Sequence, residues 1–412
     1  MRSFPIHLLV SYIFFYFLII LSVGCTSSTK EKDNSFYYET DEAKSSGKKC
    51  SLNLTDTLKI EVGTQISPLM MNGRIFTAEK SHYLSFFNNQ TYNLTFFPLS
   101  PQQAKAISIE IEKEGPEGIR NVKDFFIQSM DSIFILSGRM NEKMIYLINQ
   151  KGEINYKWDL NKHLSENFEN YWLGHDTEIK HYRLHYNPEK KEIYFYMYNG
   201  NIIDKKTQST YTQIALNLKN NTFREFGKLP IAFKEKSFYP MFGIGSLFSS
   251  NKVINFSPSL NDLVLYDLDS LKFIKAINLE SKYSNNLIIG EDAIGYDPTI
   301  AQERDFLTES DFYTHMLTNS TGDYIYRFLK LGQSAKITNG ENRDPLDLKF
   351  SVQVLDENLD LILEKDFSES QPMFFLESFA IDNKLYISFN NPLNENFSEN
   401  HKQYYVYKME CN

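Results

Sequence analysis

Three histidines, His175, His181 and His185, occur in one short stretch of the chain together with Asp176 and Glu178. Alternate residues of a strand point to the same side, so His181 and His185 would share one face and both could bind a metal ion. No cysteine and no compact ligand spacing accompanies them. We therefore expect no metal site here and interpret these histidines as structural or surface residues of a strand.

Aromatic and charged residues also occur together in a long connection between predicted strands that contains Tyr296, Asp297 and Arg304. A tyrosine ring can stack on a sugar or a peptide, while carboxylate and guanidinium groups can orient the polar groups of such a ligand. Loops on a rigid scaffold commonly carry binding sites. The alternative is a solvated loop closed by the turn chemistry of Asp297 and Pro298. We name Tyr296, Asp297 and Arg304 as candidate ligand-binding residues.

A fourth candidate is Arg327, which lies between Tyr326 and Phe328 in an apolar stretch. An arginine on such a strand either points into a channel, where it can bind a ligand, or pairs with a carboxylate. The sequence leaves both interpretations open.

The sequence contains no Gly-x-Ser-x-Gly, phosphate-binding loop or His-Glu-x-x-His motif. With 52 Asp and Glu residues, a pair of carboxylates contributed by separate strands could still form the site of a hydrolase or lyase. The formal net charge of −9 argues against a nucleic-acid partner. We favour a binding protein over an enzyme, and we expect no cofactor.

One repeated pattern would position these candidates: a short apolar strand, a polar turn, and a strand that alternates apolar and polar residues. Aromatic residues make up 15% of the chain, which also favours strands. Copies of this hairpin occupy residues 92–112, 144–160, 211–226, 262–279 and 350–367. Further strand pairs between them occupy residues 125–136, 182–198, 312–328 and 375–389.

Two strands are left without a neighbour in sequence, Asp56–Val62 at the beginning and Gln403–Lys408 at the end. If they pair with each other, they complete a sixth unit and close a ring, so that no sheet edge is left between the termini. The predicted fold is therefore all-β, a β-propeller of six blades closed by its N- and C-terminal strands. Seven or eight blades, or a sandwich with extra hairpins, remain as alternatives.

The N-terminus has a basic residue, an apolar run and small residues just before Cys25. This order is typical of a secretory signal, and its last residues resemble a lipobox. An uncleaved membrane helix is the alternative. We predict a lipoprotein signal peptide at residues 1–24, a lipid on Cys25, a flexible polar tether at residues 25–50 and a propeller at residues 51–412.

After lipidation of Cys25, two cysteines remain, Cys50 and Cys411, at opposite ends of the predicted propeller. In an oxidising compartment two such cysteines favour a disulfide, and here it would join the two strands that close the ring. Two unrelated free thiols are the alternative.

Four short motifs carry a resemblance to a known family: Asn88-Asn89, Glu-Gly-Pro-Glu-Gly at 114–118, Asp-Ser-Ile-Phe at 131–134 and Tyr-Arg-Phe at 326–328. On these motifs the chain resembles a family of uncharacterised Bacteroidetes lipoproteins, defined as a domain of unknown function and related to six-bladed propellers. The resemblance spans most of residues 51–411. It implies a fold and a location in the cell envelope, and it assigns no catalytic residues to this chain.

Together these expectations describe a lipoprotein of the cell envelope, on the outer membrane and facing the periplasm or the surface. Its partners would be the membrane, through the lipid anchor, and a glycan, a peptide or an envelope protein bound by the propeller. The alternative is a carbohydrate-active hydrolase or lyase that uses carboxylates in the channel.

Overall fold

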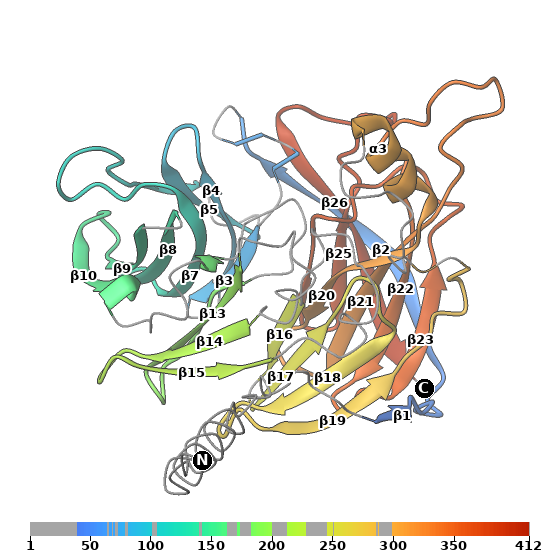
Figure 1. Ribbon diagram of the computed structural model, residues 1–412. Helices are drawn as coiled ribbons and strands as arrows, with labels where there is room; N and C mark the ends of the chain where they lie inside the picture. The colour runs from blue at the N-terminus through green and yellow to red at the C-terminus, as the bar shows by residue number, and fades with distance from the viewer. Residues whose placement is uncertain are drawn as a thin grey trace, which may run out of the picture. The chain divides into compact units, whose positions relative to one another are not determined.

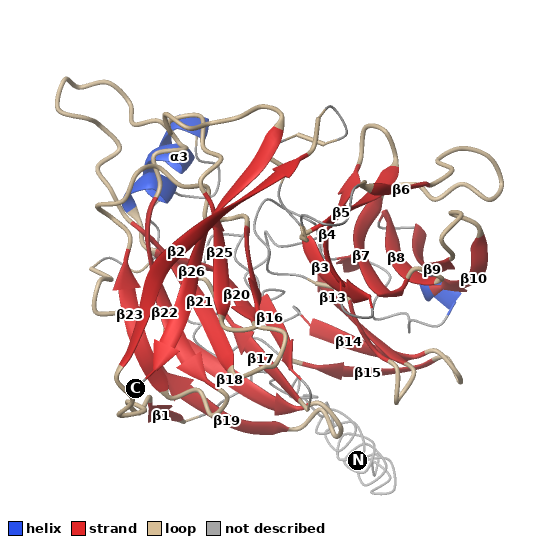
Figure 2. Cartoon of the chain, turned by 180° about the vertical axis from the view of Figure 1, so that it is seen from behind, coloured by secondary structure: helices blue, strands red, loops and turns tan. Residues whose placement is uncertain are grey.

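The computed structural model describes residues 39–63, 66–67, 69–70, 73–78, 81–100, 105–139, 142–162, 171–173, 183–199, 212–227, 245–249, 251–285, 287 and 299–411. Strands dominate this part of the chain, as Figure 2 shows. The predicted signal peptide and Cys25 lie outside the described residues.

The strands form six sheets arranged as the blades of a ring (Figure 1). Blade 1 contains β3 (Arg74–Ala78), β4 (Ser81–Asn88), β5 (Asn93–Pro98) and β6 (Ile107–Glu110). Blade 2 contains β7 (Val122–Ser129), β8 (Ser132–Arg139), β9 (Glu142–Ile148) and β10 (Ile154–Asp159). Blade 3 contains β11 (Tyr171–Leu173), β12 (His185–Asn187), β13 (Glu192–Asn199), β14 (Thr212–Asn217) and β15 (Thr222–Phe226).

Of the other three blades, blades 4 and 6 also contain a strand from the N-terminal end of the chain. Blade 4 contains β16 (Gly245–Ser249), β17 (Lys252–Phe256), β18 (Asp262–Asp267), β19 (Phe273–Asn278) and β1 (Thr40–Glu42). Blade 5 contains β20 (Phe312–Thr318), β21 (Tyr324–Leu331), β22 (Lys349–Asp356) and β23 (Leu361–Asp366). Blade 6 contains β24 (Ser378–Ile381), β25 (Lys384–Ser388), β26 (His401–Cys411) and β2 (Cys50–Glu61). The predicted six-bladed β-propeller is confirmed.

The first strands of neighbouring blades lie against one another, for example β3 against β7 and β16 against β20. The first strand is therefore the innermost strand of its blade, and the later strands lie progressively farther out. Because each blade repeats the same strand order, the innermost strands all begin at the same end of the ring.

Five of the hairpin turns share one local device, which explains why the pattern could be read from the sequence. An Asn or Asp at the end of a strand accepts a bond from a backbone amide in the turn, as Asp267 does from Ser270 at 2.7 Å. A residue shortly afterwards then takes the left-handed conformation, as Leu271 does with φ of 56°. The same device recurs as Asn88 with Tyr92, Asn187 with Lys191, Asn217 with Asn221 and Asp356 with Leu359.

The ring closes by the predicted pairing of the two strands that have no neighbour in sequence, one near each end of the chain. The strand β2 pairs antiparallel with β26, from Cys50 opposite Cys411 to Glu61 opposite His401, and Figure 2 shows β2, β26 and β25 side by side. A disulfide joins Cys50 and Cys411, whose Cα atoms are 4.1 Å apart.

Two elements differ from the sequence-based expectations. Thr40–Glu42 forms β1, which pairs in parallel with β19, so the predicted tether of residues 25–50 is partly a component of the ring. Its polar side chains stay exposed because only the backbone is needed to pair with a sheet edge. The helix α3 (Ile300–Glu309) lies in a segment expected to be a loop, and a capping box of Thr299 and Gln302 begins it.

Most of the core lies between neighbouring blades. Between blades 5 and 6, for example, the rings of Phe328, Phe350 and Phe375 stack, with 4.3 Å between the centroids of Phe350 and Phe375. Each blade therefore buries its faces against the two blades beside it, and the innermost strands are held in fixed positions.

Candidate functional site

Three blades contribute charged groups where their innermost strands begin. The guanidinium of Arg74, at the start of β3, contacts the carboxylate of Asp124 on β7 with 2.5 Å between Nη2 and Oδ2. Its Nη1 donates to the carbonyl of Leu184, just before β12, at 3.1 Å. The amide of Leu184 donates to the same Asp124 oxygen. Asp124 thereby fixes both the arginine and the backbone of blade 3.

These bonds cross the inside of the ring. Arg74 belongs to blade 1 and Leu184 to blade 3, two blades that are not neighbours in the ring. A second bond runs in the opposite direction, from Nη1 of Arg183 to the carbonyl of Gly73 at 3.5 Å. We name Gly73, Arg74, Asp124, Arg183 and Leu184 the channel cluster, because these contacts between blades 1 and 3 are made beside β7, the innermost strand of blade 2.

The charges of the channel cluster are only partly enclosed. The side chains of Arg74 and Asp124 are 12% and 14% exposed. Gly73 leaves room for the aromatic ring of Phe86, since a Cβ atom at this position would lie 2.8 Å from a ring carbon. The close approach of this backbone to Phe86 positions the carbonyl that accepts from Arg183.

Aromatic rings continue the cluster toward blade 4. His185, on β12, stacks on Phe248 of β16 with 4.5 Å between ring centroids and 5° between ring planes. Phe126 of β7 meets the same imidazole edge to face at 5.3 Å. Burial and the positive charge of Arg74 lower the pKa of His185 to about 4. The imidazole is therefore neutral at neutral pH.

The placement of His185 bears on the histidine stretch singled out in the sequence. His175 and His181 lie outside the described residues, and His185 is packed between aromatic rings. Within the part of the chain that the structure describes, no group of three or more His, Cys, Asp or Glu side chains is placed to bind a metal ion.

The predicted ligand-binding residues are not brought together by the described structure. Tyr296 and Asp297 lie outside the described residues. Arg304 is on α3, where its Nη2 contacts Oδ1 of the adjacent Asp305 at 2.6 Å, and its side chain is 33% exposed. Arg304 is therefore a surface residue of the helix.

Arg327 lies on β21 and is fully buried, with 0% of its surface exposed. Its guanidinium donates to the carbonyls of Leu260 at 2.8 Å and Asn261 at 2.9 Å, and it lies 3.3 Å from the ring centroid of Tyr313. Burial lowers the pKa of Arg327. This placement differs from both interpretations of the sequence, because carbonyls at the end of a blade 4 loop surround the guanidinium. Arg327 links blades 4 and 5.

Similar polar links join the other neighbouring blades, and nothing in the local sequence predicts them. Lys402 of blade 6 is fully buried, contacts the carboxylate of Glu377 and donates to the carbonyl of Met70, beside blade 1, at 2.7 Å. Burial lowers the pKa of Lys402. The remaining junctions are linked by Gln213 to Asn255 at 3.0 Å, His315 to Ser378 at 2.8 Å, and Asp124 to Arg74 and Leu184.

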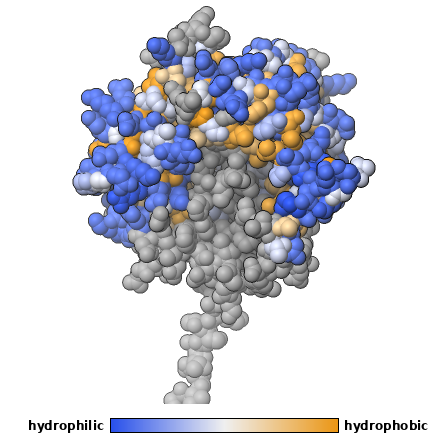
Figure 3. Space-filling model, turned by 90° about the horizontal axis from the view of Figure 1, so that it is seen from above, coloured by the Kyte–Doolittle hydropathy of each residue, from blue (hydrophilic) through white to orange (hydrophobic). Residues whose placement is uncertain are grey.

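The channel cluster and its aromatic neighbours thus combine guanidinium donors, one carboxylate, a neutral imidazole and half-buried phenyl rings. Guanidinium groups bind carboxylates and other acceptors, and aromatic faces pack against sugar rings and peptide side chains. Figure 3 shows one face of the molecule, on which the described side chains toward the outer edge are mostly hydrophilic and apolar ones gather nearer the middle. The described residues contain no helix long and apolar enough to cross a membrane.

A search of curated proteins finds no match to this chain. Among solved structures, a member of the DUF4221 family from Bacteroides vulgatus ATCC 8482 has a TM-score of 0.71 and 20% identity, covering 88% of this chain and 99% of that one. A protein from Bacteroides fragilis NCTC 9343, named as an exported protein, has a TM-score of 0.50 and 10% identity, covering 92% and 99%. At these identities the likeness concerns the fold.

The family model of DUF4221, described as a domain of unknown function, matches residues 48–366. This match begins just before β2 and continues through β23, and so covers most of the ring. The chain therefore belongs to the DUF4221 family, in agreement with the family resemblance of its sequence motifs.

Proposed function

We propose that the protein is a cell-envelope lipoprotein whose propeller binds a glycan, a peptide or an envelope protein at the channel cluster. The observation that carries this proposal is the bridge between blades 1 and 3, in which Arg74 and Arg183 each donate a hydrogen bond to a backbone carbonyl of the other blade. Charged groups and aromatic rings from four successive blades meet there, and the charged side chains are partly exposed.

The rigidity of the ring supports this function. A site whose groups are already held in place loses little conformational entropy when a ligand binds. Asp124 holds Arg74 and the Leu184 backbone, and the blades on either side are linked by buried polar contacts. The channel cluster is therefore organised before any ligand arrives.

The proposed location in the cell envelope rests on the N-terminal sequence. The apolar run and the small residues before Cys25 favour export and lipidation on the outer membrane. The structural relative from Bacteroides fragilis is named as an exported protein, and the Cys50–Cys411 disulfide suits an oxidising compartment.

Metabolic labelling with an alkyne fatty acid tests the lipid. The wild type should be labelled, whereas Cys25→Ser should remain an unlabelled precursor because the thiol that accepts the diacylglyceryl group is gone. Equal labelling of both proteins would contradict the anchoring.

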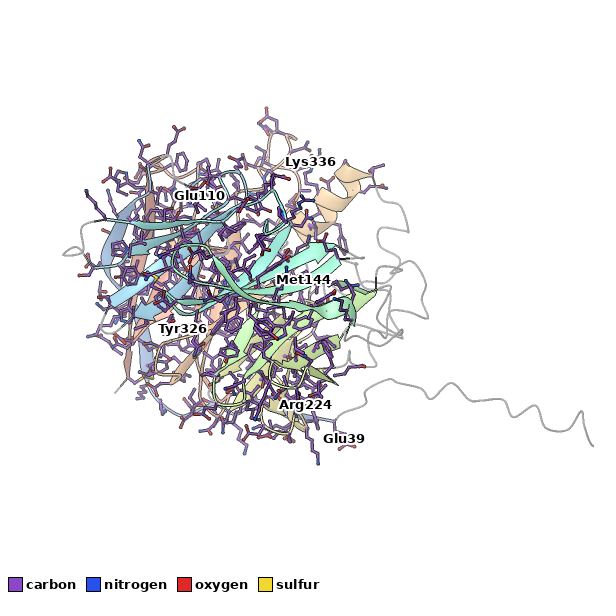
Figure 4. All side chains as sticks on the ribbon, turned by 90° about the vertical axis from the view of Figure 1, so that its left-hand side faces the viewer. Glu39, Glu110, Met144, Arg224, Tyr326 and Lys336 are labelled. Atoms are coloured by element: carbon purple, nitrogen blue, oxygen red, sulfur yellow. A yellow bond between two sulfur atoms is a disulfide. The ribbon has the colours of Figure 1, made fainter. Side chains whose placement is uncertain are left out.

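The binding site is tested with a glycan array and with pull-down from the native envelope. Arg183→Ala should weaken capture of any ligand by about tenfold or more, since a charge-assisted hydrogen bond contributes about 1.5–3 kcal/mol. The control variant is Arg224→Lys, on the outer strand β15, which keeps a cation beside the buried carboxylate of Glu192 and should bind like the wild type (Figure 4 labels Arg224).

Two outcomes would contradict the binding proposal. One is an unchanged affinity for Arg183→Ala in a variant that melts like the wild type. The other is turnover of a polysaccharide by the purified protein that Asp124→Asn abolishes, which would support a hydrolase or lyase instead.

A further inference from the structure

The chain crosses the outer edges of blades 4 and 5 before it reaches blade 6. Residues 40–42 form β1 on the outer strand β19 of blade 4. On the outer strand β23 of blade 5, the amide of Leu361 donates to the carbonyl of Lys44 at 2.8 Å, and the amide of Ser46 donates to the Leu361 carbonyl at 3.0 Å. We name residues 39–49 the strap. Glu39, its first residue, lies at the periphery of the view in Figure 4.

The strap is held by few buried contacts. All three side chains of β1 are exposed. Ala43 is partly buried against the core between blades 4 and 5, and its amide donates to the carbonyl of Asn278 at 2.9 Å. Lys48 and Asp356 form an ion pair of 4.0 Å in which the lysine is 55% exposed, so water screens it. A segment with so little buried surface opens at low free-energy cost.

The strand β2, which follows the strap directly, is held quite differently. It pairs with β26 along almost its whole length. Leu52 and Ile60 are buried in the cores on either side of blade 6, and Lys365 of blade 5 donates to the Leu52 carbonyl at 2.6 Å. Loss of β2 would expose the edge of β26 and reopen the ring.

The disulfide lies at the boundary between these two segments. Because β2 and β26 are antiparallel, the N-terminal end of β2 lies beside the C-terminal end of β26, and Cys50 opposite Cys411 is the first pair. If the strap detaches, opening would continue into β2 at this pair, one pair of residues at a time.

We propose that the strap detaches from the ring independently and that the Cys50–Cys411 disulfide prevents this opening from spreading into β2. The covalent bond closes the pair at which separation of the two strands would begin. The use of such a device rests on the proposed lipid anchor, because a tether from Cys25 would pull on the strap. The disulfide then prevents this pulling force from separating β2 from β26 in blade 6.

Hydrogen exchange measured by mass spectrometry tests the proposal on residues 25–412 carrying Cys25→Ser and expressed without the predicted signal peptide. In the disulfide-bonded protein, peptides that contain Ala43 and Ser46 should exchange at least about tenfold faster than peptides of β2. In Cys50→Ser/Cys411→Ser, exchange of β2 should accelerate by about tenfold or more, beginning near residue 50. Peptides of β21 and β22 should be unchanged in both proteins.

Lys48→Ala is the matched control, since it removes only a screened ion pair and should change exchange of the strap little and leave β2 unchanged. Strap exchange as slow as that of β2 in the disulfide-bonded protein would overturn the proposal. Unchanged exchange of β2 after loss of the disulfide would overturn it as well. If the double variant fails to fold, the folded chain that carries Cys25→Ser and keeps its disulfide is reduced with a phosphine, because Cys411 is exposed, and the same comparison is made.

This experiment separates the proposal from the proposed function. The protein used carries no lipid, so the result does not depend on whether Cys25 is acylated in the cell. Failure of fatty-acid labelling would likewise leave the behaviour of the strap and of β2 unaffected.

Discussion

Two halves of the ring are built from the same blade but are completed differently. In blades 4, 5 and 6, the N-terminal segment lies outside the last strand, as β1 on β19, as the pairing of Ser45 with Leu361, and as β2 on β26. In the sheets of blades 1, 2 and 3, as far as the structure describes them, β6, β10 and β15 are the outermost strands. The half that carries the channel cluster is thus the half without the strap.

The charged links between blades differ in exposure between the two halves, although buried charges occur in both, such as Lys143 of blade 2. Lys402 and Arg327 are fully buried and hold blades 4, 5, 6 and 1 together. Arg74 and Asp124 keep 12% and 14% of their side chains exposed. Similar side chains therefore serve as structural links in one half and remain partly accessible to a ligand in the other. The following changes test this difference.

The largest loss of stability is expected for Lys402→Met, in blade 6. The variant leaves the carboxylate of Glu377 buried without its ion-pair partner, which should lower the free energy of unfolding by about 3–5 kcal/mol. Chemical denaturation measures this change. Glu377→Gln combined with Lys402→Met should recover part of the loss, because no unpaired charge then remains. A loss below about 1 kcal/mol for Lys402→Met would contradict the structural role of the pair.

The disulfide should have the next largest effect. Cys50→Ser/Cys411→Ser should lower the free energy of unfolding by about 2–4 kcal/mol, because the unfolded chain is no longer cross-linked. Non-reducing peptide mapping of the mature wild type should first find the two cysteine peptides linked. Separate peptides would contradict the bond, and no stability prediction would then apply.

His185 should make the free energy of unfolding fall at acidic pH. Its pKa is about 4 in the folded protein and about 6.5 in the unfolded chain. Between these values the unfolded state binds the extra proton, so stability is lost as the pH falls from about 6.5 to 4. The loss should reach about 2–3 kcal/mol for this group. His185→Phe should remove this part of the pH dependence, and an unchanged profile would contradict the assignment.

The sequence was sufficient where structure depends on local pattern. Alternating apolar residues and the Asn or Asp turns define most hairpins, and two spare strands predicted the closure. The polar links were not predictable, since Arg74 meets Asp124 and Leu184 at separations of 50 and 110 residues. β1 was missed because backbone pairing on an edge leaves no apolar pattern.

The smallest change in stability is expected for Arg304, one of the two arginines named as candidates from the sequence. It contrasts with the larger loss expected for the other, Arg327. Arg304→Ala removes a half-exposed ion pair with Asp305, and such pairs contribute about 0–1 kcal/mol. Alanine also has the higher helix propensity, so the free energy of unfolding should change by less than about 0.5 kcal/mol. Arg327→Leu should instead cost several-fold more, because buried carbonyls lose their donor. Thermal denaturation of both variants measures the contrast, and equal losses would show that exposure does not separate their roles. If Arg304→Ala keeps its stability but loses a ligand that the wild type captures, then α3 contributes to binding, and the site extends beyond the channel cluster.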